Sequence, residues 1–232
     1  MITLRKAQDR GKANFGWLDS KHSFSFGSYY DAQHMGFSKL RVINDDTVAP
    51  SAGFGTHGHR DMEIISFVTH GVIEHKDSMG NVQTLPKGEF QLMSAGKGVQ
   101  HSEYNGSESD DLKFLQIWIE PSEFGGNPGY QQKDFGQQFG LTPVITPDGA
   151  NGTLQIKQDA TLSQLILAAG ETLTASIEAD RKYYVHQVEG QISVNQQELQ
   201  IGDGAKVQDT AQLVFHNAGA ESAVALVFDL PR

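Results

Sequence analysis

The stretch GFGTHGHRDME at residues 53–63 contains two histidines, His57 and His59, separated by a single residue. A second short motif with the same spacing, His101-x-Glu103, follows farther along the chain. In a β-strand, residues i and i+2 project from the same face of the sheet. Two such strands lying side by side would bring three imidazoles and a carboxylate together. The pattern therefore predicts a metal site built on paired strands.

The sequence around these motifs is typical of β structure throughout. Short runs rich in Val, Ile and Phe, such as MEIISFV at 62–68 and LKFLQIWIE at 112–120, are bounded by Gly, Asn, Asp and Pro. No segment of helix length shows an apolar period of 3.6 residues. DSMGN at 77–81 lies between two strand-like runs and predicts a hairpin turn. We therefore expect an all-β fold.

The composition changes between residues 120 and 152, where Gly, Pro and Gln replace the alternating pattern. Strand-like runs resume beyond this stretch. We predict a first barrel over residues 1–125, a connector over 126–152 and a second barrel over 153–232. The sequence leaves open whether the first strands pack on the second barrel.

The two halves also resemble distant repeats. HGVIEHKDSMGNVQTLPKGEF at 70–90 is similar to EGQISVNQQELQIGDGAKV at 189–207, since each contains a glycine, a strand, a turn, a strand and a turn with glycine. Counting back from Gly71 and Gly190, and onward from Gly88 and Gly204, gives the counterparts of the candidate ligands in the second half. They are Ser176, Glu178 and Ala218, with His216 near the place of the remaining imidazole. The repeat predicts two copies of one β-barrel, with the metal in the first.

Composition narrows the classes of function. The 232 residues include no cysteine, so any metal must be held by imidazole and oxygen ligands. The net charge of −10, without a cluster of Lys and Arg, argues against direct binding to nucleic acid. No run reaches the ~18 to 20 apolar residues of a membrane span, and MITLRKAQDRGKANFG lacks the apolar stretch of a signal peptide. We expect a soluble, cytoplasmic protein that does not enter membranes.

Several segments resemble the pirin family, a branch of the cupin superfamily. They are HSFSFGSYYD at 22–31, LRVINDD at 40–46, GFGTHGHRDME at 53–63 and LPKGEFQLMSAGKGVQHSEYN at 85–105. The resemblance implies a bicupin, in which two jelly-roll barrels pack face to face in one chain. It also implies one iron ion in the N-terminal barrel, with the ligands His57, His59, His101 and Glu103.

The chain departs from the family pattern at two positions. Gly58 stands where the family usually has proline, and His70 stands where an acidic residue is common before the glycine. Glycine leaves the backbone freer than proline does. We expect looser metal binding as a result.

The identity of the metal and of the fourth ligand remains open from the residues alone. Imidazole and carboxylate together suit iron, copper, nickel, manganese or zinc, and the family implies Fe(II). Glu63 is a rival carboxylate, because a general cupin pattern has a glutamate a few residues after the His-x-His motif. We assign Glu103 as the ligand and Glu63 as a supporting residue, for example one that hydrogen-bonds a ligand imidazole.

Four residues that flank the ligand strands are candidates for the wall of a substrate pocket: Phe54, Met93, Gln116 and Trp118. The alternative for the apolar ones is a place in the barrel core. The other histidines of this half are not assigned to the metal. His70 and His75 are expected to face solvent, and His22 and His34 lie in a polar, aromatic loop that permits either burial or exposure.

The resemblance to pirins implies two alternative functions for this site. The first is a dioxygenase that cleaves quercetin or a related small phenolic with O2 and releases carbon monoxide, with Glu103 as the proton acceptor. The alternative is a redox-sensing module without catalysis, which docks on a protein partner as transcription co-regulators do. Because both barrels belong to one chain, we expect a monomer.

Overall fold

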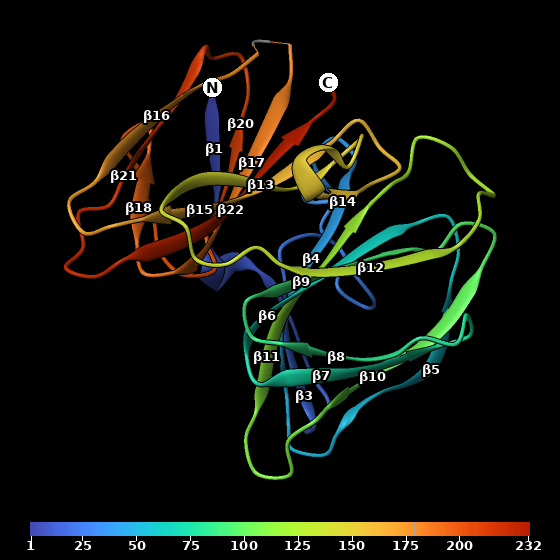
Figure 1. Cartoon of the computed structure of the whole chain (residues 1–232). Coiled ribbons are helices and arrows are strands. Elements are labelled where there is room, and N and C mark those ends of the chain that lie inside the picture. The colour runs from blue at the N-terminus through green and yellow to red at the C-terminus, as the bar shows by residue number, and fades with distance from the viewer. Residues whose placement is uncertain (179) are drawn as a thin grey trace. The chain divides into compact units, whose positions relative to one another are not determined.

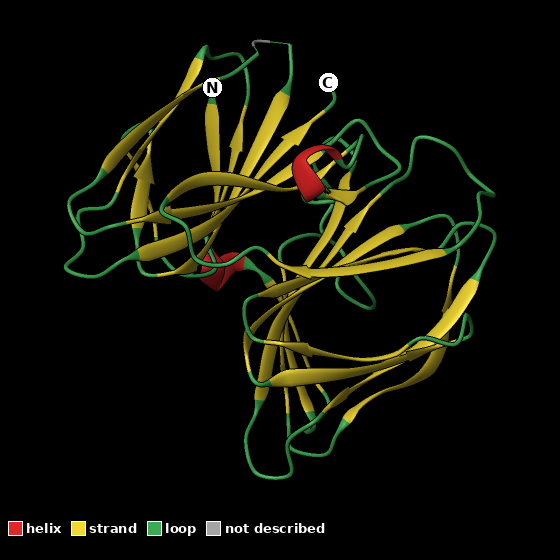
Figure 2. Ribbon diagram, in the orientation of Figure 1, coloured by secondary structure: helices red, strands yellow, loops and turns green. Residues whose placement is uncertain are grey.

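The computed structural model describes residues 1–178 and 180–232. Within these residues the chain forms twenty-two strands and two short 3-10 helices, η1 (Ala7–Asp9) and η2 (Ala150–Gly152) (Figure 2). The strands divide into two compact units, each with one seven-stranded and one four-stranded sheet. The prediction of an all-β bicupin is confirmed. The part of the chain that the structure describes contains no helix long and apolar enough to cross a membrane.

The unit that we call the N-terminal barrel comprises Gly11–Gly136 and Ile156–Gln158. Its larger sheet has the strand order β12 (Gly129–Asp134), β9 (Glu89–Ser94), β6 (Glu63–His70), β11 (Leu112–Ile119), β4 (Leu40–Val48), β3 (Leu18–His22), β2 (Gly11–Asn14). Its smaller sheet has the order β5 (Gly53–His59), β10 (Val99–Asn105), β7 (Val72–Asp77), β8 (Val82–Pro86) (Figure 1). β7 and β8 form the predicted hairpin around 77–81.

The other unit, the C-terminal barrel, comprises Met1–Arg10, Gln137–Gln155 and the chain from Asp159 to Arg232. Its larger sheet has the order β1 (Ile2–Arg5), β20 (Gly204–Val207), β17 (Lys182–Glu189), β22 (Ala223–Leu230), β15 (Thr161–Leu167), β13 (Gly140–Thr146), β14 (Leu154–Gln155). Its smaller sheet has the order β16 (Thr172–Ser176), β21 (Gln212–His216), β18 (Ile192–Val194), β19 (Gln197–Leu199).

The units differ from the predicted boundaries of 1–125, 126–152 and 153–232. β1 pairs with β20 and so belongs to the C-terminal barrel. The stretch expected to be a connector contains two strands, since β12 pairs with β9 in the N-terminal barrel and β13 pairs with β15 in the C-terminal barrel. The composition did not indicate these strands because Gly and Pro have low strand propensity, whereas pairing with neighbouring strands decides the structure.

The larger sheet of the N-terminal barrel buries a row of polar side chains, which we call the polar row. Its members are neighbours across β3, β4, β11, β6 and β9: His22, Asn44, Gln116, Ser66 and Gln91. All five are buried. Burying polar groups costs free energy unless they are hydrogen-bonded, so the row indicates a functional interior.

Two asparagines show how the barrels correspond. The side-chain amide of Asn105 donates to the carbonyls of Val48, Ala49 and Asp110, and its Oδ1 accepts from the N–H of Ser107. The amide of Asn217 donates in the same way to the carbonyls of Leu167, Ala168 and Glu221, and its Oδ1 accepts from the N–H of Gly219. β10 and β21 are therefore equivalent strands, aligned at these two residues.

This alignment corrects the predicted counterparts of the ligands. Counting back from the asparagines, His101 corresponds to Leu213 and Glu103 to Phe215. Ala175 lies opposite Leu213, as His57 lies opposite His101. Ile177, whose N–H bonds to the carbonyl of Ala211, takes the place of His59, which lies opposite Val99.

The predicted counterparts Ser176, Glu178 and Ala218 are therefore wrong. His59 lies four residues before Glu63, the first residue of β6, whereas Ile177 lies five residues before Lys182, the first residue of β17. The prediction did not allow for this extra residue. A shift of one residue moves a side chain to the other face of its strand. The glycines were also mismatched. Gly88 corresponds to Gly202 rather than Gly204, because both adopt a positive φ and donate their N–H to β6 and β17, respectively.

Candidate metal centre

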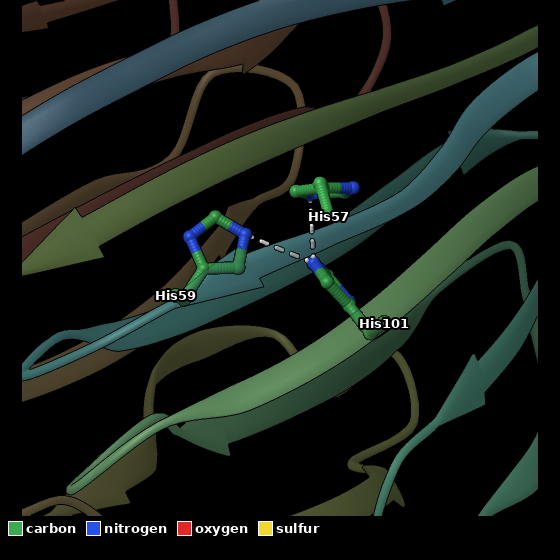
Figure 3. Close-up of side chains that lie close together, drawn as sticks. All are labelled: His57, His59 and His101. Carbon is green, nitrogen blue, oxygen red and sulfur yellow. Dashed lines mark hydrogen bonds between the residues drawn. The ribbon is translucent and has the colours of Figure 1, made fainter.

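The three histidines meet in the N-terminal barrel, as the spacing predicts. β5 and β10 are antiparallel neighbours in the smaller sheet, with His57 opposite His101 and His59 opposite Val99. The Nε2 atom of His101 lies 3.0 Å from that of His57 and 3.0 Å from that of His59 (Figure 3). Three ring nitrogens thus converge on one point.

Their spacing fits a metal ion. Two nitrogens bound at about 2.1 Å and at right angles lie about 3.0 Å apart, as these nitrogens do. The Nδ1 of His57 lies 2.8 Å from the carbonyl oxygen of Gly55. A hydrogen bond from Nδ1 to this carbonyl leaves the Nε2 of His57 without a proton and free to bind a metal.

Burial keeps two of these imidazoles uncharged. It is the main cause that lowers the pKa of His59 to about 4 and that of His101 to about 3, with neighbouring histidines adding to the effect. A metal binds the neutral imidazole. Both rings are therefore in the binding form at neutral pH.

Glu103 is buried beside His101 on β10. Its Oε1 accepts a hydrogen bond of 3.2 Å from the Oγ of Ser66, whereas its Oε2 is buried without a partner. Burial raises the pKa of the Glu103 carboxyl to about 7, although hydrogen bonds from Ser66 and Gln116 oppose the rise. An unpartnered buried oxygen next to a cluster of imidazoles is suited to receive a metal or a proton.

The structure also brings in His75, which we expected to face solvent. It is buried, because β7 alternates and places Ile73, His75 and Asp77 on the inner face. Its Nε2 lies 3.1 Å from the Oδ2 of Asp77. One ligand atom each from His75, His101 and Glu103 lie within 4.8 Å of one another, as do those of His57, His59 and His101. The alternation that starts at Ile73 was the signal for this burial.

Glu63 lies in a different environment. Its buried Oε2 accepts hydrogen bonds from the Oγ of Ser94 at 2.8 Å and from the backbone N–H of Lys157 at 3.2 Å. Burial is the main cause that raises the pKa of Glu63. Neither triplet of close ligand atoms found among the described residues includes it. Its contacts attach the segment 156–158 to the N-terminal barrel.

A pocket of about 290 Å³ opens beside the histidines. Three of the four predicted wall residues line it, together with both histidines of β5: Phe54, Gln116, Trp118, His57 and His59. Met93 does not line this pocket. It is fully buried in an apolar cluster with Ile64, Ala95 and Val99, so the alternative role in the core applies to it.

Sequence reasoning missed a polar group at this pocket. Ser20, His22, Asn44 and Asp46 are buried on β3 and β4 and line the cavity. The Oγ of Ser20 donates a hydrogen bond to Asp46, and the Nε2 of His22 lies 2.9 Å from the same Oγ. The alternating polar residues of LDSKH at 18–22 were the available signal, but alone they also fit an exposed strand.

The C-terminal barrel shows what this interior looks like without polar groups. The counterparts of the candidate ligands, all packed in one apolar cluster, are Ala175, Ile177, Leu213 and Phe215. His75 has its counterpart in Val194, which lies opposite Phe215 as His75 lies opposite Glu103. These side chains offer no nitrogen or oxygen ligand. The same architecture is therefore stable with an entirely apolar filling at these positions.

Two barrels of matching topology, one with converging imidazoles and the other apolar, define a bicupin with a single candidate metal centre. The chain belongs to the pirin family. Residues 3–119 match the family model described as pirin, and residues 143–230 match the model described as the quercetinase C-terminal cupin domain.

Known proteins support this assignment over the whole length. The chain is 48% identical to quercetin 2,3-dioxygenase of Escherichia coli O157:H7, an alignment that covers 100% of this chain and 99% of the relative. The structure matches the crystal structure of YhhW from Escherichia coli with a TM-score of 0.97 at 46% identity, covering 100% of this chain and 98% of the other. Bacterial pirin YhhW has also been solved in complex with nickel(II), and that structure matches with a TM-score of 0.96 at 46% identity, covering 100% and 99%.

Proposed function

We propose that the chain is a metal-dependent dioxygenase that cleaves quercetin or a related flavonol with O2 and releases carbon monoxide. The observation that carries the proposal is the convergence of three imidazoles at the edge of a pocket with aromatic walls, where the Nε2 of His101 lies 3.0 Å from the Nε2 of His57 and 3.0 Å from that of His59. The relatives named quercetin 2,3-dioxygenase support the choice of substrate class.

We propose Fe(II) as the metal, held by four residues of the smaller sheet: His57, His59, His101 and Glu103. The donor set also accepts nickel, copper, manganese or zinc, and a solved relative contains nickel(II). A bound ion of this kind supplies a Lewis acid for a phenolic oxygen and, where it is redox-active, a path for electrons to dioxygen.

The residues of the chain orient the substrate and handle its proton. Phe54 and Trp118 give the pocket flat apolar walls that suit an aromatic ring and exclude water. The Oε2 of Glu103 would take the proton of the 3-hydroxyl, because this buried carboxyl oxygen has no hydrogen-bond partner within the described residues. Ser66 and Gln116 would hold the carboxyl in place during that transfer.

The test is turnover by the protein purified with its native metal, whose identity is measured on the same sample. We expect loss of quercetin absorbance, matching oxygen uptake and release of carbon monoxide. His57→Ala should lose the metal and at least 100-fold of the rate. His70→Ala is the matched control, because His70 is exposed on β6, and it should keep both.

Two outcomes would overturn parts of this proposal. Metal-loaded wild-type protein that consumes neither quercetin nor oxygen would rule out the flavonol dioxygenase and favour a redox-sensing module that docks on a protein partner. Unchanged metal content and turnover in His57→Ala would instead rule out the assigned ligands. A native metal other than iron would correct the choice of Fe(II) alone.

A further inference from the structure

The pocket has a second polar group on its wall, which the proposed function does not use. His57 and His59 face it from β5 of the smaller sheet, whereas Ser20, Asn44 and Asp46 face it from β3 and β4 of the larger sheet. The walls between them include three aromatic rings: Phe26, Phe54 and Trp118. Phe26 packs edge-on against both His22 and Trp118, with ring centroids 5.2 and 5.3 Å apart. The cavity is thus lined by aromatic rings, with imidazoles contributed by the smaller sheet and a second polar group contributed by the larger sheet.

The fold itself does not require a carboxyl and a hydroxyl at the places of Asp46 and Ser20. Asp46 lies between Ser20 and Phe114 across neighbouring strands. At the same place in the C-terminal barrel, Leu165 lies between Leu141 and Ala225. The equivalent barrel therefore builds this part of its core from carbon alone, and Leu165 is fully buried there.

Asp46 and its neighbours are costly to bury. Asp46 is 2% exposed, and burial is the main cause that raises the pKa of its carboxyl to about 7. The Oδ1 of Asn44, also on the wall of the pocket, is buried without a hydrogen-bond partner. A buried polar atom that faces a cavity and lacks a partner leaves a hydrogen bond for a ligand to complete.

We propose that Asp46, held by Ser20 and assisted by Asn44, is a second anchor for the substrate, which binds a hydroxyl other than the oxygens at the histidines. This inference rests on the proposed function, since it takes the ligand to be a flavonol. It specifies a polyhydroxylated aromatic whose chelating oxygens lie at the histidines and whose other hydroxyl reaches the carboxyl of Asp46. Flavonols without a second hydroxyl should bind more weakly.

Binding of two probes to the nickel-loaded protein, under anaerobic conditions, tests the proposal. Quercetin has the chelating oxygens and further hydroxyls, whereas 3-hydroxyflavone has the chelating oxygens alone. Quenching of tryptophan fluorescence reports binding, because Trp118 lines the pocket. We expect the wild-type protein to prefer quercetin by about 10-fold or more, as a site built to bond a hydroxyl rejects a ligand that lacks it.

Two variants locate the preference. Asp46→Leu introduces the residue found at the equivalent position, Leu165. It should weaken the binding of quercetin and leave the affinity for 3-hydroxyflavone unchanged, which would reduce the preference to less than twofold. Ser20→Ala, a milder change, should reduce it part of the way. Asp45→Leu is the matched control, since Asp45 is next in the chain but does not line the pocket, and it should keep the full preference.

Three outcomes would overturn the second anchor. They are equal affinity of the wild-type protein for the two probes, no binding of either probe, and a full preference kept by Asp46→Leu. Turnover of quercetin by the wild-type protein is measured separately. Turnover without any preference would rule out this anchor alone, and a preference without turnover would rule out the dioxygenase alone.

Discussion

Glu103 and Phe215 occupy the same strand position in the two barrels, since each lies two residues before an asparagine, Asn105 or Asn217, that makes equivalent hydrogen bonds. One position thus holds a buried carboxyl in the N-terminal barrel and a buried phenyl ring in the C-terminal barrel. Because the two barrels share one architecture, comparing these two residues shows how much folding stability the buried carboxyl costs the protein.

Replacing the carboxyl by carbon should stabilise the metal-free protein. The pKa of Glu103 in the folded protein is about 7, above the ordinary value of 4.5, so its ionisation opposes folding increasingly as the pH rises from about 4.5 to about 7. At pH 8 we expect Glu103→Leu to raise stability by about 1–4 kcal/mol, measured by thermal unfolding. Phe215→Glu is the mirror control and should destabilise. A metal-free Glu103→Leu protein that melts below the wild type would contradict this account.

Metal affinity should depend on pH through Glu103 rather than through His59 or His101. Both imidazoles have pKa values of about 4 or below and are neutral above pH 5, whereas the Glu103 carboxyl must lose a proton with a pKa near 7. Between pH 5 and 7, nickel affinity should rise with pH, because binding releases the proton of Glu103. Calorimetry in buffers of different ionisation enthalpy counts the protons. Glu103→Gln should bind more weakly and with a much flatter pH profile; an unchanged slope would show that another group titrates.

Glu63 should prove unnecessary for the metal. Its carboxylate bonds to Ser94 and to the backbone of Lys157, and glutamine can still accept a hydrogen bond there. We expect Glu63→Gln to change nickel affinity by less than twofold. Glu63→Leu leaves the Ser94 hydroxyl and the Lys157 N–H without their acceptor and should cost about 1–3 kcal/mol of stability. If Glu63→Gln lost the metal to the same extent as Glu103→Gln, Glu63 would be the ligand after all.

His75 should support the site without being required to bind the ion. Its ring packs at a centroid distance of 5.4 Å from His101 and 4.8 Å from Tyr130, and its Nε2 is paired with Asp77. His75→Val, which copies the counterpart Val194, should lower nickel affinity by less than 10-fold. The loss in His57→Ala should exceed 100-fold, as measured by competition with a chelator. Equal losses in the two variants would place His75 among the ligands.

The central part of the site could be predicted because it depends on local geometry. Residues at i and i+2 share a strand face whatever the rest of the chain does, so His57 with His59 and His101 with Glu103 follow from spacing alone. That β5 and β10 are neighbours needed only the barrel pattern. The hairpin at 77–81 was equally local.

The parts that failed depend on distant contacts. The counterparts in the C-terminal barrel required the strand register, which one extra residue before Lys182 shifts. His75 looked exposed because a polar residue beside a turn usually is, whereas its burial follows from pairing with β10. Asp46 was not predicted as a site residue because an aspartate in a strand is usually exposed at the surface. The cavity that it lines is visible only in the structure.

The placement of β1 has a consequence for how the protein is made. β1 is synthesised before any other strand of either barrel. It pairs with β20, where Ile2 lies opposite Val207. At typical rates of translation, about 200 residues take on the order of ten seconds or longer. During that interval β1 has no sheet to join, whereas all strands of the N-terminal barrel, the last of which is β12, are synthesised before β20. The metal-binding half can therefore assemble on the ribosome, while the larger sheet of the other half is completed only when the end of the chain folds back to receive the earliest strand.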